Sequence, residues 1–243
     1  MREIAIQSQN LSDLPPEVQA TLADLLPRLL SALPGITTIA LFGSAAEGRM
    51  RRASDVNLIV VADDFKQGFE KVHGELSLAH AAQVRIMFVS SRELQGAAEL
   101  FAVKFQDIKR RHRLLFGTDP FKDLTLKQDA IRFRLRQTLL NLILRQRGLF
   151  AMNGNKADRM TRVIAELAGP LRGIAAAFLS LQGKDLNPRE ALVAVAASMN
   201  AGAAVEQISV AREKLGLDLK TAVHTHTQLV DLCEALLAKV ESL

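Results

Sequence analysis

Residues 41–61 read LFGSAAEGRMRRASDVNLIVV, two apolar runs separated by a polar, basic loop. The first run ends at Gly43-Ser44, and the second opens with Ser54-Asp55-Val56-Asn57. Both runs are rich in large apolar and β-branched residues, which is typical of buried strands. Because side chains alternate along a strand, we expect Asp55 and Asn57 on one face, with the apolar residues between them facing the core.

The loop between the two strands has the chemistry of a phosphate site. A glycine allows the backbone to come close to a ligand, and a serine hydroxyl and loop N–H groups donate hydrogen bonds to phosphate oxygens. Arginines in the loop supply the positive charge that a triphosphate requires. The residues that we expect to bind such a ligand here are Gly43, Ser44, Arg49, Arg51, Arg52 and Ser54.

This arrangement resembles the signature of the nucleotidyltransferase superfamily: Gly-Ser, a loop, then Asp-x-Asp at the start of a strand. The similarity is to the polymerase-β-like group and its minimal nucleotidyltransferases, and it covers residues 36–121. It implies a domain of the α/β (α+β) class with a mixed sheet. It also implies binding of a nucleoside triphosphate, with ATP as the first choice, and transfer of NMP to a hydroxyl of a small molecule or macromolecule with Mg²⁺.

The chain departs from this family pattern at two positions. Asn57 stands where the second aspartate is expected, and Arg85, on the strand predicted at 84–89, stands where a third carboxylate is expected. A guanidinium places positive charge where a divalent cation would bind, and an Arg85–Asp55 ion pair is an alternative occupant of that position. Asp55 and Asn57 remain the residues assigned to catalysis, and Asp55 is the one assigned to metal. We therefore expect Mg²⁺ binding to be weak or absent and catalysis to be impaired.

Other acids were considered as replacements for the missing carboxylates. Glu47 lies in the loop, within reach of the site, and Asp107 lies in a predicted downstream helix. Asp63-Asp64 follow the second strand at its far end, so we expect them to cap a helix that begins near Phe65.

Strands and helices alternate up to Pro120, and only helices are expected after it. The first part predicts strands at 36–42, 55–62 and 84–89 and helices at 16–33, 65–82 and 91–112. The second part predicts helices at 127–150, 156–181, 188–200, 203–215 and 220–243. Pro170 should kink the second of these helices. We expect a nucleotidyltransferase-like domain over residues 1–121 and a helical bundle over residues 122–243.

Composition and charge limit the ligands and the cellular compartment that we expect for this chain. The 243 residues carry a net charge of +5, concentrated in basic clusters such as 109–113. These clusters suit phosphates, nucleic acid or an acidic partner, or are solvated helix faces. We see neither a signal peptide nor a run long and apolar enough to cross a membrane, so we expect a cytoplasmic protein.

The single cysteine, Cys233, is expected in the core. The absence of Trp and Tyr argues against single-stranded nucleic acid as the main ligand.

Three functions remain open at this stage. The first is an enzyme that transfers NMP to a small-molecule, protein or RNA acceptor. The second is a non-catalytic protein that senses a nucleotide or another anion through Arg49, Arg51, Arg52 and Arg85. The third is a protein-interaction module, in which the helical domain pairs into a homodimer or docks a partner.

Overall fold

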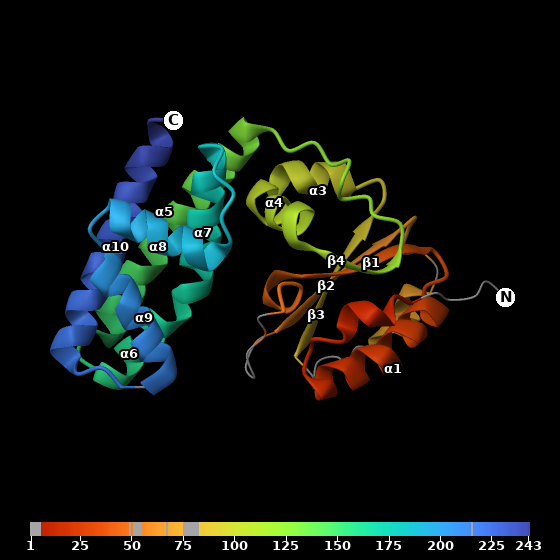
Figure 1. Ribbon diagram of the computed structural model, residues 1–243, viewed down its shortest axis with the longest axis horizontal. Coiled ribbons are helices and arrows are strands. Elements are labelled where there is room, and N and C mark those ends of the chain that lie inside the picture. Colours follow the sequence, from red (N-terminus) through yellow and green to blue (C-terminus); the bar gives the residue numbers. More distant parts are fainter. Residues whose placement is uncertain (1–5, 49, 51–54, 67, 75–82, 215) are drawn as a thin grey trace. The chain divides into compact units, whose positions relative to one another are not determined.

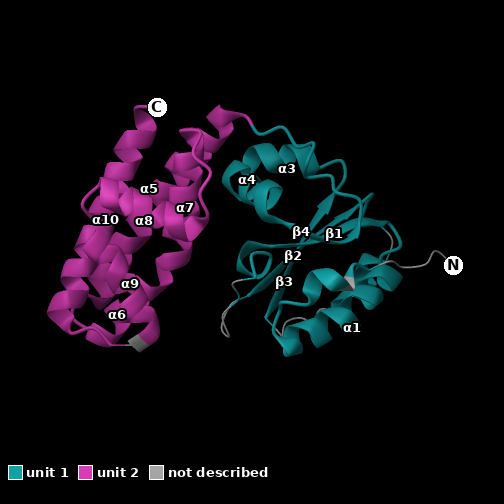
Figure 2. Cartoon of the chain, viewed as in Figure 1, with its two compact units in different colours: residues 1–126 teal, residues 127–243 magenta. Residues whose placement is uncertain are grey.

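The computed structural model describes residues 6–48, 50, 55–66, 68–74, 83–214 and 216–243. The chain divides into two compact units, residues 1–126 and residues 127–243, where the sequence had placed the division after residue 121 (Figures 1 and 2). Each unit has its own secondary-structure class: strands occur in the first, and the described residues of the second are helices and their connections.

Four strands form the sheet of the first unit. These are β1 (Ile36–Phe42), β2 (Val56–Ala62), β3 (Val84–Ser90) and β4 (Arg113–Gly117), in the order β3-β2-β1-β4. β1 is antiparallel to both of its neighbours, whereas β2 and β3 are parallel. The sheet is therefore mixed, which confirms the predicted fold class. The predicted strands did not include β4, because a five-residue edge strand carries little periodic signal.

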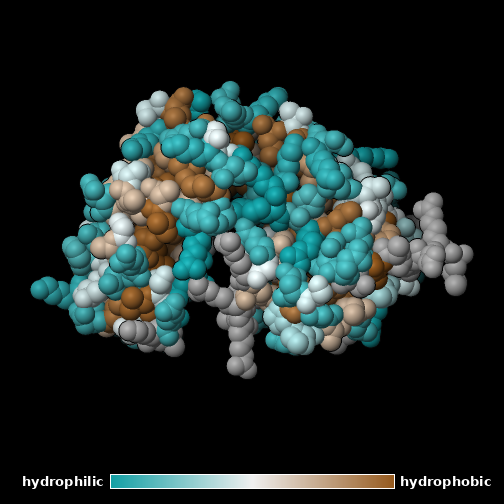
Figure 3. Space-filling model, in the orientation of Figure 1, coloured by the Kyte–Doolittle hydropathy of each residue, from teal (hydrophilic) through white to brown (hydrophobic). Residues whose placement is uncertain are grey.

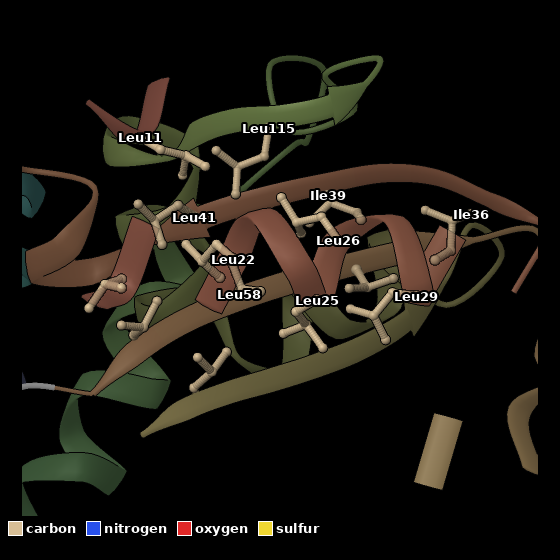
Figure 4. Packing of buried hydrophobic residues seen from close by; sticks show 14 of the residues in the cluster. Leu11, Leu22, Leu25, Leu26, Leu29, Ile36, Ile39, Leu41, Leu58 and Leu115 are labelled. Atoms are coloured by element: carbon tan, nitrogen blue, oxygen red, sulfur yellow. The ribbon is translucent and has the colours of Figure 1, made fainter. Parts of the chain in front are cut away.

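Helix α1 (Pro16–Ala32) covers one face of the sheet. Its apolar residues recur at helical spacing, and Leu22, Leu25, Leu26 and Leu29 are at most 1% exposed. They pack against side chains of β1, β2 and β4 (Figure 4). A short 3-10 turn, η1 (Ser8–Leu11), lies against β4. This layer fixes which side chains of each strand are buried under α1 and which face the opposite way.

Two helices cover the other face: α3 (Leu94–Leu100) and α4 (Ala102–Arg111). The sequence predicted one helix over this span, but the backbone leaves helical geometry at Phe101 (φ −116°, ψ 40°). The core on this side contains Phe105 and Ile108 of α4 together with sheet residues such as Ile59. Breaking the helix gives α4 its own direction across the sheet, and this direction brings its polar face to the site described below.

The segment after β2 differs from its prediction. The helix expected from residue 65 is helical over residues 69–74, and residues 75–82 lie outside the described part of the chain. Asp64 does not cap a helix at Phe65; its Oδ1 accepts the backbone N–H of Lys66 at 2.9 Å and closes a turn. The aspartate side chain is short enough to accept a hydrogen bond from a nearby backbone N–H group. Such a bond stabilises a turn in competition with the start of a helix.

The second unit is built around α5, which contacts α6, α7 and α10. Its helices are α5 (Gln128–Asn153), α6 (Ala157–Glu166), α7 (Ala168–Leu181), α8 (Pro188–Ser198), α9 (Gly202–Lys214) and α10 (Leu219–Glu241). The predicted kink is a break: α6 ends and α7 begins around Leu167, so that Pro170 falls in the first turn of α7, where a missing N–H is tolerated. Two helix starts are capped by side chains, α8 by Asn187 and α10 by Asp218.

The surface of the second unit mixes polar and hydrophobic residues (Figure 3). The sequence predicted no run long and apolar enough to cross a membrane, but residues 157–181 are long and apolar enough by length and composition alone. This segment is mostly buried, and it is split between α6 and α7. Burial of this kind is what a core helix pair of a helical bundle requires.

Candidate functional site

Three residues from neighbouring strands lie in one row across the sheet. Register pairs Phe42 of β1 with Asn57 of β2, and Asn57 with Arg85 of β3. The residues two positions further along, such as Ile59, belong to the core under α3 and α4, so the row lies on that face of the sheet. Asp55 immediately precedes β2 and is two residues from Asn57. The sheet therefore brings together the positions that the sequence assigned to catalysis with Arg85.

Arg85 and Asp55 form an ion pair at this place. Arg85 Nε lies 3.0 Å from Asp55 Oδ2, and the two side chains are 72% and 40% exposed. Asn57 Nδ2 donates a long hydrogen bond of 3.4 Å to the backbone carbonyl of Asp55. The ion pair that was predicted as an alternative to metal binding is therefore present. In it, the Arg85 guanidinium contacts the Asp55 carboxylate, which a metal cation would need as a ligand.

These residues do not fit a two-magnesium centre. Magnesium needs several oxygen ligands in octahedral geometry, and the row together with Asp55 offers one carboxylate, one amide and one guanidinium. Within the described ranges, no group of three or more His, Cys, Asp or Glu side chains lies together in a way that could hold a metal ion. Arg85 would also repel a divalent cation placed beside Asp55.

Gly43 and Ser44 turn the chain at the end of β1. They belong to η2 (Gly43–Ala45), and Gly43 adopts the left-handed conformation with φ 77°. A Cβ atom at this position would lie 3.5 Å from Asn57 Nδ2, so the turn passes directly beside the Asn57 amide. Ser44 is half-buried. The loop predicted to hold phosphates therefore adjoins the row of strand residues. Arg49, Arg51, Arg52 and Ser54, also assigned to phosphate binding, lie outside the described residues.

The two acids considered as replacement ligands are both engaged by Arg111. Its Nη1 lies 3.1 Å from Glu47 Oε1, and its Nη2 pairs with Asp107 Oδ1 one helical turn earlier on α4. Arg111 and Glu47 are each 20% exposed, so this contact is partly shielded from solvent. Glu47 and Asp107 thus serve to fix the loop to α4. A cation that recruited them would have to displace a guanidinium.

Arg113 fixes the same loop from the other side. Its guanidinium pairs with the Asp13 carboxylate and donates to the backbone carbonyls of Asn10 and Ala46, each at 2.9 Å. The hydrogen bond from Arg113 is the main reason that the pKa of the Asp13 carboxyl lies below its ordinary value. Gly48 is needed here because a Cβ atom would lie 2.7 Å from Asp13 Oδ2, and φ is 67°.

The basic cluster at 109–113 is therefore largely structural. Lys109 Nζ donates to the Leu124 carbonyl at 2.8 Å, His112 Nε2 lies 3.0 Å from Asp119 Oδ2, and Arg111 and Arg113 hold the loop. The sequence analysis predicted that this cluster binds a phosphate or an acidic partner or forms a solvated helix face. In the structure these side chains instead contact groups of the same unit. The partners are distant in the chain, so only folding could identify them.

Lys104 is a site residue that sequence reasoning missed. Its Nζ lies 5.6 Å from the centre of the Phe42 ring, at the β1 end of the row. Lys104, Asp107 and Arg111 recur at i, i+3 and i+7, so they share one face of α4. That spacing was the available signal, but the predicted single helix did not show which of its faces met the Gly43-Ser44 loop.

Comparison with known proteins assigns part of the chain to a family. Residues 22–113 match the family model described as a nucleotidyltransferase domain. The chain resembles the crystal structure of spectinomycin adenyltransferase AAD(9) from Enterococcus faecialis with ATP and spectinomycin. That match has a TM-score of 0.58 and 15% identity over 88% of this chain and 98% of that chain, and at this identity it shows the fold. No curated protein sequence matches the chain significantly.

Two weaker likenesses are to toxin–antitoxin structures. One, solved with AMP-PNP, is 26% identical over 41% of this chain and 73% of that chain, with a TM-score of 0.30. The other contains a tri-AMPylated Shewanella oneidensis HEPN toxin with an MNT antitoxin. It is 23% identical over 41% of this chain and 72% of that chain, with a TM-score of 0.28.

Proposed function

Since residues 22–113 place the first unit in the nucleotidyltransferase superfamily, we propose that this unit binds a nucleoside triphosphate and does not carry out two-metal NMP transfer. The phosphates bind at the Gly43-Ser44 turn, beside the Asn57 amide. ATP is the first ligand to test, because the spectinomycin adenyltransferase of the same fold was solved with ATP. A nucleotide ligand is consistent with the cytoplasm, which stays our proposed compartment.

The observation that carries this proposal is the Arg85–Asp55 ion pair. Nucleotidyl transfer develops negative charge on the α-phosphate and on the leaving pyrophosphate, and metal ions held by carboxylates stabilise that charge. Here Arg85 binds the Asp55 carboxylate, and Asn57 contributes a neutral amide. The remaining groups suit the binding of phosphate more than the activation of a hydroxyl that attacks it.

The competing function is catalysis. In that case Asp55 would have to leave Arg85 to hold Mg²⁺, with Asn57 as a weak second ligand, and the metal would supply stabilisation of the charge that develops on the α-phosphate and the leaving pyrophosphate. This function needs an acceptor, such as a small molecule or a protein. It predicts release of pyrophosphate that depends strictly on Mg²⁺ and on Asp55.

Calorimetric titration of the full chain with ATP, in buffer with Mg²⁺ and in buffer with EDTA, tests the proposal. We expect saturable binding and, in parallel assays with Mg²⁺, no pyrophosphate release above buffer. The matched variant is the double substitution Asn57→Asp/Arg85→Asp, which restores three carboxylates and should bind ATP only with Mg²⁺. If the folded, unmodified chain binds ATP in neither buffer, or releases pyrophosphate with Mg²⁺, the proposal is wrong.

A second function is favoured by one observation in the second unit. Phe133, Leu140 and Leu144 on α5 are 69%, 47% and 54% exposed and, at i, i+7 and i+11, form one stripe. Arginines beside this stripe already pair with acids of α10, Arg136 with Glu241 and Arg147 with Glu234. Two copies of the chain could therefore approach without repulsion between uncompensated arginines, so we propose that α5 forms a homodimer contact.

Light scattering after size exclusion tests this second function. We expect a dimer for the unmodified chain and a monomer for the Phe133→Ser/Leu144→Ser variant. Val193→Ser is the control, because Val193 is similarly exposed (58%) but lies on α8. A monomer for the unmodified chain at high concentration would overturn it.

A further inference from the structure

We propose that Arg85 and Lys104 take the place of magnesium, so that the site binds the triphosphate chain as the metal-free anion. This inference rests on the proposed nucleotide binding and goes further, because it names the ionic form of the ligand and adds Lys104 to the site. The shared chemistry that is recognised is a row of three anionic phosphates, which free tripolyphosphate also offers.

Hydrogen-bond and charge donors follow one another in order across the sheet. Lys104 Nζ lies over Phe42 of β1, Asn57 is the registered neighbour on β2, and Arg85 is the registered neighbour on β3. Neighbouring strands are about 4.8 Å apart, so β1 and β3 are separated by about 10 Å. An ammonium, an amide and a guanidinium therefore follow one another across three strands. A triphosphate chain laid across the strands meets one donor after another.

The charge of the site favours a metal-free anion. Three carboxylates in this row would repel a polyphosphate unless metal ions lay between them. Here Arg85 pairs with the Asp55 carboxylate and Lys104 lies over the Phe42 ring, so these two cations carry one more unit of charge than this carboxylate. Chelation by Mg²⁺ removes two negative charges from the triphosphate and so weakens its attraction to these cations. The magnesium ion itself would also meet Arg85 at the Asp55 carboxylate.

Both cations are accessible to a ligand. Arg85 is 72% exposed, and Lys104 is also exposed, so both can turn towards a ligand without breaking the core. Asp55 competes with a phosphate for the Arg85 guanidinium, since Nε already lies on its carboxylate. Removing the Asp55 charge should therefore strengthen anion binding. A metal-dependent site predicts the opposite sign, because Asp55 would be its main ligand.

The test is calorimetric titration of the full chain and its variants with ATP in EDTA and in excess Mg²⁺, with tripolyphosphate as competitor. We expect tighter binding in EDTA and competition by tripolyphosphate. Arg85→Gln and Lys104→Gln should each weaken binding about tenfold, the loss of one charge-assisted contact to phosphate. Asp55→Asn should tighten it. Lys122→Gln is the matched control, since Lys122 is exposed (76%) in the same unit, and it should leave the affinity unchanged.

The possible outcomes separate the two proposals. If ATP binds in neither buffer, the proposed function itself fails. The present inference is overturned, with nucleotide binding intact, if Mg²⁺ tightens binding, if Asp55→Asn abolishes it, or if tripolyphosphate does not compete. If Lys104→Gln behaves like Lys122→Gln, the assignment of Lys104 is wrong. Circular dichroism of each variant establishes that a lost affinity does not reflect unfolding.

Discussion

Arg111 Nη1 lies 3.1 Å from Glu47 Oε1, a contact that joins α4 to the loop after Gly43-Ser44. The same guanidinium pairs with Asp107 on its own helix. One guanidinium therefore pairs with two acids and fixes the position of the loop. The loop owes its position near Asn57 to this contact and to the hydrogen bond that the Ala46 carbonyl accepts from Arg113.

Replacing Arg111 with Gln should loosen the loop and destabilise the first unit. Glu47 and Asp107 would then face each other without a cation, and the contact is only 20% exposed. We expect a loss of about 1–3 kcal/mol in the free energy of unfolding, between the values for exposed and buried pairs. Urea titration measures the loss. Arg28→Gln removes an exposed arginine paired with Asp24 and is the control, with a change below about 0.5 kcal/mol.

Replacing Gly43 with Ala should strain the turn at the end of β1. Its φ of 77° lies in the left-handed region, which costs a residue with a Cβ atom about 1–2 kcal/mol. We expect that loss of stability in urea titration, together with weaker ATP binding in calorimetry. Gly35→Ala is the matched control, because the nearest atom to its added Cβ would be the Asp64 carbonyl oxygen at 3.9 Å. Equal effects of the two substitutions would contradict the prediction.

The second unit should lose stability in mildly acidic solution. Burial lowers the pKa of His226 below its ordinary value of 6.5, and its Nε2 lies 3.2 Å from Gln146 Oε1. Below pH 6.5 the unfolded chain therefore binds more protons than the folded chain, so the free energy of unfolding falls as the pH falls towards the folded-state pKa.

Urea titrations at several pH values between 7 and 5 measure this slope. His226→Gln should reduce it, while His224→Gln, at an exposed position on the same helix, should keep it. A slope unaffected by His226→Gln would assign the acid sensitivity to other groups.

Cys233 should be inert in the folded protein. It is 1% exposed, and burial raises its pKa to about 12. Because the thiolate is the reactive form, labelling by a disulfide reagent near pH 8 should be on the order of a thousandfold slower in buffer than in denaturant. Absorbance of the released thiol measures both rates. Fast labelling of the native chain would mean that α10 is not packed as described.

Much of the fold followed from local patterns. The strands predicted at 36–42, 55–62 and 84–89 match β1, β2 and β3 closely, and the helices of the second unit begin and end near the predicted residues, except that the helix predicted at 156–181 is divided into α6 and α7. These elements carry strong periodicity and clear breaks at proline and glycine. The family resemblance and the mixed-sheet fold class are also confirmed. The break at Phe101 and the short strand β4 were missed because tertiary contacts, more than local preference, determine them.

The sequence by itself determined the elements, their alternation and the types of residue at the site: a Gly-Ser turn, one carboxylate, an asparagine and an arginine. Strand alternation even placed Asp55 and Asn57 on one face. Only the tertiary structure decided which of these groups meet. Register sets Asn57 beside Arg85, packing brings Lys104 over Phe42, and Arg111 and Arg113 bind the loop. The physical reason is that strand pairing and the contacts of long side chains join residues that are far apart in the chain. The periodicity of the sequence does not indicate which of these distant residues will be partners.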